Sequence, residues 1–119
     1  MSLSNSDCGV PQIISATTDG AALHTFPLNA TDTDEVWLYA TNLTATAATI
    51  NITIYNLATT VSHYVIYNYS IAAGSGLTVL LPGSLAVKGD GSTGRYLRAF
   101  SNTANAIAIH GFINRITQT

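Results

Sequence analysis

Charged side chains are scarce in this chain, and their scarcity excludes several classes of protein. Lys, Arg, Asp and Glu make up 8% of the 119 residues, against roughly 25% in typical globular domains. The four basic residues are too few to neutralise a track of phosphates, so we expect no nucleic-acid partner. A surface with so few charges is neutral and adhesive, which suits a protein packed against other copies of itself or against a larger assembly.

Cysteine and long apolar runs are equally scarce. The single cysteine, Cys8, excludes an internal disulfide, so the fold does not depend on an oxidising compartment. Nothing in the sequence indicates the histidine partner that a nucleophilic thiol needs, and we expect Cys8 to be a tolerated free thiol. No apolar run approaches the roughly 20 residues of a membrane helix, and no basic segment followed by an apolar one marks a signal peptide. We therefore expect no membrane partner.

The titratable residues lack the spacings of metal-binding motifs. His24, His63 and His110 fall on three different predicted strands. They show none of the local zinc spacings, so packed or surface histidines are expected unless the fold makes them converge. Asp32 and Asp34 end a polar loop that has no glycine of the kind that calcium loops usually contain. A solvated turn is the expected structure there, with a calcium site as the alternative.

Motifs of common catalytic sites are also missing. The chain has no G-x-S-x-G elbow for a nucleophilic serine. The glycine-rich segment KGDGSTG at 88–94 is not followed by a helical pattern, so it predicts a plain loop rather than a phosphate-binding one. Most of the acidic residues lie in predicted loops or near the N-terminus, which does not favour the carboxylate pair of a glycosidase. We expect a protein that is not an enzyme and that has no cofactor and no metal.

What the chain does contain is alternation of apolar and polar residues at period two. In residues 48–55, every second side chain is aliphatic or alanine. This alternation predicts a half-buried strand of an antiparallel sheet. The run VWLY at 36–39 is also of strand type. The small and polar residues 42–47 between the two runs predict that they form a hairpin with a longer loop.

Further strand-type segments, separated by turn residues, fill the rest of the chain. Strands are predicted over residues 12–18, 21–26, 62–71, 77–81, 84–87, 95–101 and 106–116. Asp19 and Gly20 predict a tight hairpin between the first two of these strands. In the third, the alternation places Tyr64 on the face opposite Tyr67.

The pattern as a whole is that of an all-β protein, because no segment keeps a helical period over ten or more residues. About seven to nine short strands, with turn signals every ~8–12 residues, predict an antiparallel β-sandwich or jelly-roll. A single domain is expected over residues 11–119, and the polar residues 1–10 are expected to form a flexible N-terminal arm. Exposed strand edges need a cover, and with so few charges we expect contacts between copies to supply it.

Aromatic residues are concentrated on the predicted strands, and several lie opposite the aliphatic stripe. The four that we expect to form an interface are Trp37, Tyr55, Tyr67 and Phe100. Aromatic stripes of this kind usually form a second layer of core or a subunit interface, and the N-terminal arm is expected to add contacts to a neighbouring copy. A sugar-stacking platform is the alternative, since aromatic faces also bind sugar rings.

Strand and turn segments follow one another in a recognisable order along residues 34–116. They are V-W-L-Y-A-T-N-L-T-A-T-A-A-T-I-N-I-T-I at 36–54, I-A-A-G-S-G-L-T-V-L-L-P-G at 71–83 and R-Y-L-R-A-F-S-N-T-A-N-A-I-A-I-H-G-F at 95–112. This order resembles a recurrent small β-sandwich of tailed bacteriophages, in which an L-R-V-Y-A-S-x-A-N hairpin lies near the C-terminus. Where that pattern has an acidic Glu-Ala-Gly-Asp turn, this chain has Gly-Asp-Gly-Ser at 89–92.

The resemblance implies a structural role. Such proteins are virion components, either capsid decoration or cement proteins or parts of head and tail fibres, and many form trimers. From the resemblance we expect a non-enzymatic capsid decoration or cement subunit of a tailed phage, made in the host cytoplasm and placed on the capsid surface. Its expected partners are copies of itself, as a trimer, and the major capsid protein or fibre neighbours. The alternative is a carbohydrate- or receptor-binding module of a head or tail fibre.

Overall fold

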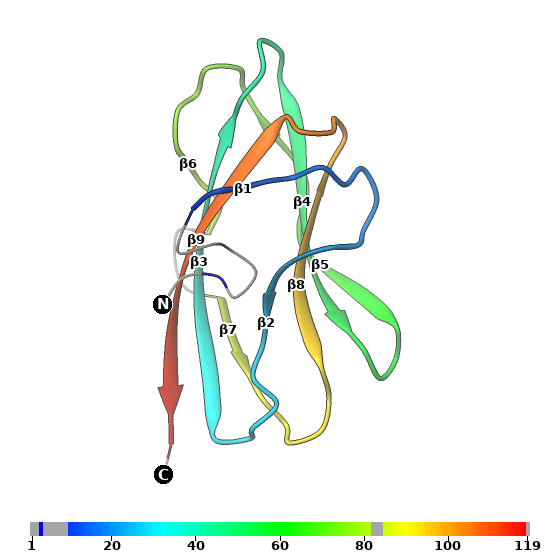
Figure 1. Cartoon of the computed structure of the whole chain (residues 1–119), viewed down its shortest axis with the longest axis vertical. Coiled ribbons are helices and arrows are strands. Elements are labelled where there is room, and N and C mark those ends of the chain that lie inside the picture. Colours follow the sequence, from blue (N-terminus) through cyan, green and yellow to red (C-terminus); the bar gives the residue numbers. More distant parts are fainter. Residues whose placement is uncertain (1–2, 4–9, 82–84, 119) are drawn as a thin grey trace.

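Two antiparallel sheets pack face to face in the computed structural model, which describes residues 3, 10–81 and 85–118 (Figure 1). The strands of these residues are β1 (Gln12–Ile13), β2 (Ala21–Thr25), β3 (Asp32–Asn42), β4 (Ala48–Asn56), β5 (Val61–Ile71), β6 (Thr78–Val79), β7 (Leu85–Lys88), β8 (Arg95–Ser101) and β9 (Ile107–Thr117). The described residues include no helix long and apolar enough to span a membrane. The predicted all-β sandwich is confirmed.

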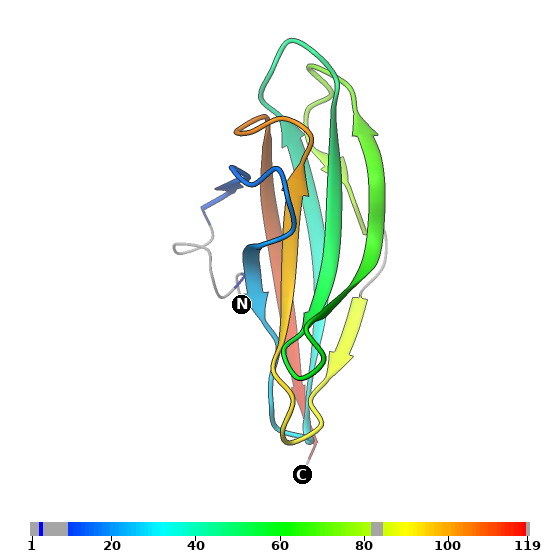
Figure 2. The same ribbon diagram turned by 90° about the vertical axis from the view of Figure 1, so that its right-hand side faces the viewer.

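The strand order is that of a jelly-roll. Sheet A has the order β1-β9-β3, and both β6 and β7 pair with the remaining edge of β3. Sheet B has the order β2-β8-β4-β5. When β6 and β7 are counted as one interrupted strand, consecutive strands alternate between the sheets except for β4 and β5, which are neighbours in sheet B, and this is the arrangement of a jelly-roll. Figure 1 shows the two sheets side by side as separate layers, and Figure 2 views the molecule from the side of sheet B, whose strands lie in front of β3 and β9 of sheet A.

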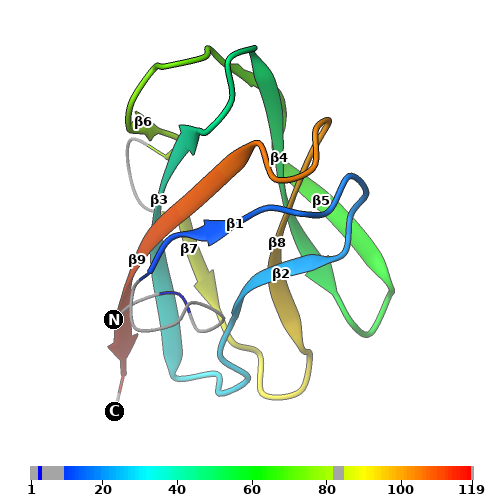
Figure 3. The ribbon, with the colours of Figure 1, turned by 45° about the horizontal axis from the view of Figure 1, so that its top comes forward.

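Both hairpins predicted in the first half of the chain are wrong. β1 pairs with β9 and β2 pairs with β8, so residues 14–20 cross from one sheet to the other (Figure 3). In the same way, β3 pairs with β9 whereas β4 pairs with β8 and β5. Period-two alternation tells which face of a strand is buried, but not which strand lies beside it. A short polar loop can cross the roughly 10 Å between two sheets as readily as it turns within one.

Asn42 fixes the second of these crossings, from β3 to β4. Its side-chain nitrogen donates hydrogen bonds to the carbonyl oxygens of Thr46 and Ile71, both at 2.9 Å. Its side-chain oxygen accepts from the backbone N–H of Thr44 at 2.9 Å and from the Thr44 hydroxyl at 2.8 Å. Because Asn42 ends β3 in sheet A and Ile71 ends β5 in sheet B, one buried amide ties the two sheets together at this end.

The core lies between the sheets and is made by the inward side chains of the long strands. Their fully buried members on β3, β4, β8 and β9 are Val36, Leu38, Ala40, Ile50, Ile52, Leu97, Ala99, Ile107, Ile109 and Ile113. The alternation predicted for β8 and β9 is confirmed residue by residue, since Leu97 and Ala99 are buried while Phe112 and His110 point outward. The apolar area that these residues remove from water is the main force joining the two layers.

In β5 the predicted alternation fails because the strand is bulged. Between the pairs Ile50↔Tyr69 and Thr53↔Tyr64, β5 contains two more residues than β4. Asn68 has a positive φ of 49°, and its backbone N–H donates to the side-chain oxygen of Asn51 at 2.8 Å. The bulge brings Tyr64 and Tyr67, predicted on opposite faces, into edge-to-face ring contact at 4.9 Å.

Of the predicted N-terminal arm, residues 1–2 and 4–9 lie outside the described residues, and Cys8 is among them. Leu3 is described, and it is 2% exposed within the chain's own core. It lies against Gly111 on the inner face of β9, where a Cβ would come within 2.7 Å of the Leu3 side chain. Glycine at this position therefore leaves room for Leu3 to pack.

The Asn42 crossing generates a stability prediction. Asn42→Asp keeps the acceptor oxygens but replaces the amide donor with a carboxylate that faces two carbonyl oxygens. We expect it to lower the free energy of unfolding, measured by urea denaturation, by at least about 2 kcal/mol.

The matched control is Asn102→Asp. Asn102 is exposed, and its side chain accepts through its oxygen from the backbone N–H of Thr49, a bond that a carboxylate can keep. We expect a change within about 0.5 kcal/mol for this variant. Equal effects of the two substitutions would contradict the role given to the Asn42 donor.

Candidate functional site

The described residues enclose no pocket, and no three of their His, Cys, Asp or Glu side chains form a group that could hold a metal ion. The three histidines do not converge. His24 is buried on β2, His63 is exposed on β5, and His110 is exposed on the outer face of β9. The surfaces that remain as candidates are the outer faces of the two sheets.

One group of charges is buried inside the sandwich, and it includes Asp34. The sequence predicted a solvated turn at this residue, and that prediction is wrong, because Asp34 lies within β3 with its side chain fully buried. Arg115 on β9 donates to both carboxylate oxygens, at 2.6 and 2.8 Å. His24 on β2 donates from Nε2 to Oδ2 at 2.7 Å. Asp34 thus connects sheet A to sheet B at the end of the core opposite Asn42.

The pKa values of these groups follow from their burial and their partners. Burial lowers the pKa of His24, and the hydrogen bond to Asp34 offsets only part of that effect. Burial alone would raise the pKa of Asp34, but hydrogen bonds from Arg115 and His24 outweigh it and lower the pKa below 3.8. At neutral pH the cluster is a carboxylate paired with a guanidinium and capped by a neutral imidazole. It positions the two sheets and has no open side for a substrate.

The outer face of sheet A carries a row of cross-strand aromatic pairs. Trp37 on β3 packs against Phe112 on β9, with ring centroids 5.1 Å apart. One step further along the ladder, Tyr39 lies 6.4 Å from His110. Phe112 is 49% exposed, so the row is open to contact from outside.

The outer face of sheet B carries a second aromatic group. Tyr55 and Tyr96 are stacked with their centroids 6.3 Å apart, and the guanidinium of Arg98 lies 3.7 Å above the ring of Tyr55. Nearby, Tyr64 contacts both Tyr67 and Phe100 edge to face. These rings surround a polar group formed by Asp19 and its partners.

Asp19, predicted as a turn residue, instead folds over sheet B. Its carboxylate accepts hydrogen bonds from the hydroxyl of Thr53, at 2.8 Å, and from the hydroxyl of Ser62. Arg98 lies 3.8 Å from the same carboxylate. The 14–20 crossing therefore covers part of this face, which explains why Thr53, on the outward side of β4, is buried.

The structure does not bring the four predicted interface residues together. Trp37 lies on the outer face of sheet A, whereas Tyr55, Tyr67 and Phe100 lie on the outer face of sheet B. Alternation placed Tyr55 and Phe100 opposite the aliphatic residues of their strands, but it gave no information on the sheet to which each strand belongs. The protein therefore has two aromatic faces, on opposite sides of the sandwich.

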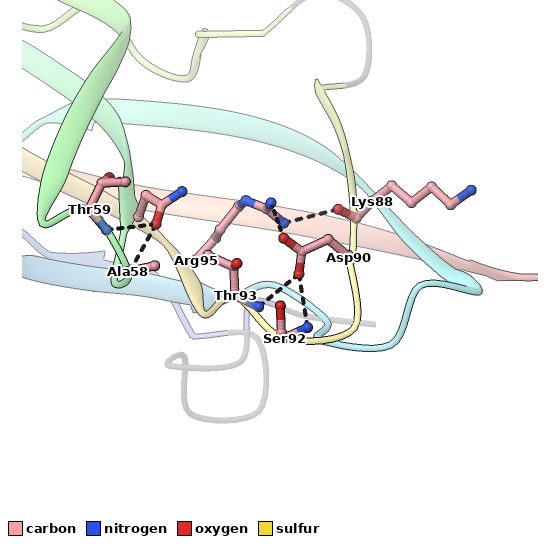
Figure 4. A network of polar contacts seen from close by, with 8 residues as sticks. Ala58, Thr59, Lys88, Asp90, Ser92, Thr93 and Arg95 are labelled. Atoms are coloured by element: carbon pink, nitrogen blue, oxygen red, sulfur yellow. Dashed lines mark hydrogen bonds and ion pairs between the residues drawn. The ribbon is translucent and has the colours of Figure 1, made fainter.

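The glycine-rich segment is a loop over residues 89–94, with Lys88 ending β7, and polar groups of the segment satisfy one another (Figure 4). Asp90 accepts from the backbone N–H groups of Thr93 and Ser92, at 2.7 and 3.0 Å, and from Arg95 at 2.9 Å. The backbone hydrogen bonds are the main reason that the pKa of Asp90 is well below its usual range. Since Asp90 occupies these two N–H groups, they are not presented to a phosphate.

Comparison with known protein families, with curated proteins and with solved structures found no match.

The buried cluster predicts a dependence of stability on pH. Because the folded state lowers the pKa of His24, the unfolded chain takes up the proton more readily, and stability falls as the pH drops below about 6.5. The folded state also lowers the pKa of Asp34, so stability is lost a second time as the pH falls below about 3.8 toward that folded pKa. Urea midpoints measured from about pH 7.5 to pH 5 should decrease in the wild type and decrease less in His24→Gln, which retains a donor toward Asp34. Parallel curves for the two proteins would contradict this assignment.

Proposed function

We propose that this protein is a non-enzymatic structural component of a tailed-phage virion, and specifically a capsid decoration or cement subunit. The observation that carries the proposal is the presence of two outward aromatic faces on a sandwich with few charges. Ile13, Val79, Phe112 and Tyr67 are each about half exposed or more. A protein that works alone in water gains nothing from such exposure, whereas a subunit of an assembly covers it.

A second support comes from the fold together with the resemblance. Jelly-rolls occur in viral capsid domains and in lectins, so the topology is compatible with a virion role. The phage-like order of segments along residues 34–116 favours the capsid role over the lectin-like role. In a cement protein, each copy adds a modest contact energy, and the symmetry of the capsid repeats that contact many times.

A carbohydrate-binding module is the second candidate, favoured by exposed Tyr64 and Tyr67 beside the polar residues Asp19 and Arg98. Sugar rings stack on open, flat aromatic faces. Tyr64 and Tyr67 meet at 84°, which gives no flat platform, and Arg98 covers one face of Tyr55. The ring geometry therefore supports a protein partner better than a sugar.

Particles of the encoding phage provide the main test. We expect the chain to be detected by mass spectrometry in purified virions and by antibody labelling on the head. We also expect particles lacking the gene to release their DNA at a lower temperature. Absence of the chain from purified virions would contradict the proposal, and labelling of fibres alone would contradict the cement role.

A glycan array separates the second candidate from the first. Tyr67→Ala and Phe112→Ala each remove one exposed ring, on opposite faces of the sandwich. We expect to find no glycan that binds the wild type and Phe112→Ala but fails to bind Tyr67→Ala. A glycan that gave this pattern would support the carbohydrate-binding module instead.

A further inference from the structure

We infer that the outer face of sheet A is the surface through which two copies of this chain pack on each other about a two-fold axis. The inference deepens the proposed function, because it assigns self-association to one of the two faces and leaves the other for a different partner. The face consists of the outward residues of β1, β3, β6, β7 and β9. Its members are Ile13, Thr33, Glu35, Trp37, Tyr39, Thr41, Val79, Ala86, Lys88, Ala108, His110, Phe112, Asn114 and Ile116.

Sheet A is more regular than sheet B. β3 and β9 pair without a break from Asp32↔Thr117 to Asn42↔Ile107, and the ladder has no register shift. Sheet B, in contrast, has register shifts between β2 and β8 and between β4 and β5, and Asp19 lies over its outer face. Two sheets pack closely only when both faces are regular, so the unbroken ladder of β3 and β9 suits sheet A to sheet-on-sheet contact.

The second argument is charge. The charged side chains on this face are Glu35 and Lys88, both toward the end at which β3 begins. Glu35 accepts a hydrogen bond from Asn114 at 2.8 Å. When two copies pack about a two-fold axis with their strands antiparallel, the charged end of one copy lies against the opposite end of the other, around Thr41 and Ile13. Like charges therefore do not meet. Low charge with aromatic enrichment is the composition of interface cores.

The third argument is symmetry. Trp37 and Phe112 are the sixth residues of their 11-residue strands, and they face each other at the midpoint of the ladder. A two-fold axis through this point stacks the Trp37–Phe112 pair of one copy on the same pair of the other. Isologous contacts need such a self-complementary centre, and the residues that dominate binding are typically central aromatics.

The size of the face is also appropriate. β3 and β9 contribute 11 residues each, and the short strands β1, β6 and β7 add 2, 2 and 4. At roughly 16 Å² of sheet per residue, the face has a projected area of roughly 480 Å², so two copies together approach the roughly 1,000 Å² of total buried area expected of a biological interface. The contact gives assemblies with an even number of 12.5 kDa chains, either dimers or paired trimers if the trimer implied by the resemblance also forms.

Sedimentation of the purified protein tests the inference without any phage particle, so its failure is distinct from failure of the virion role. We expect the wild type to sediment as an even-numbered assembly. Phe112→Glu should weaken that association by at least about 30-fold, as expected for loss of a central residue. The matched control, Tyr67→Glu, places the same charge on a more exposed aromatic position of sheet B and should leave the association unchanged.

The chain also contains its own probe, because Trp37 is the single tryptophan. We expect its emission in the wild type to shift to longer wavelength on dilution, over the concentration range in which the assembly dissociates. This measurement needs no variant and stands even if Phe112→Glu fails to fold. Any one of three results would overturn the inference. They are a wild type that is monomeric at about 100 µM, a Trp37 emission that does not change on dissociation, and an association that is weakened by Tyr67→Glu but not by Phe112→Glu.

Discussion

The packing of two long antiparallel ladders against each other is the constraint on which the rest of this structure depends. β3 with β9 supplies one inner face and β4 with β8 supplies the other, and their aliphatic side chains are almost completely removed from water. The other interactions that stabilise the fold add to this contact. Asn42 and the Asp34 cluster join the two layers at opposite ends, and Leu3 fills the space beside Gly111. Burial of the inner faces in turn directs the alternate residues of each strand outward, where the aromatic rows lie.

The sequence predicted the local part of this architecture well. Alternation identified the strands at 48–55, 95–101 and 106–116 and the buried side of each, because the two-residue repeat of a strand is a property of the backbone itself. It did not predict which strands are neighbours. In a jelly-roll, most successive strands belong to different sheets, and the loops at 14–20 and 43–47 contain the same small polar residues whether they turn or cross. The bulging of β5 was also missed, since two extra residues in a strand leave no signal in composition.

The polar groups that matter were the least predictable, for a different reason. Asp34 and Asp19 lie in polar segments and were assigned to turns, which is the usual place for an isolated aspartate. Their partners lie far away in sequence. Arg115 is 81 residues from Asp34, and Thr53 and Ser62 are 34 and 43 residues from Asp19. Only the three-dimensional arrangement brings these side chains together. The four aromatics expected to form an interface lie on outer faces, but their division between two faces depends on the same non-local pairing.

The placement of the few charges links the fold to the proposed function. Three of the four basic residues are committed inside the chain: Arg115 to Asp34, Arg98 to Asp19 and Tyr55, and Arg95 to Asp90. These contacts hold loops and layers in place, and they leave the broad outer face of sheet A nearly without charge. A neutral aromatic sheet face has little to keep copies apart and much apolar area to gain by contact. The scarcity of charge that led us to expect no nucleic-acid partner thus also supports the proposal that this sandwich associates with other protein surfaces.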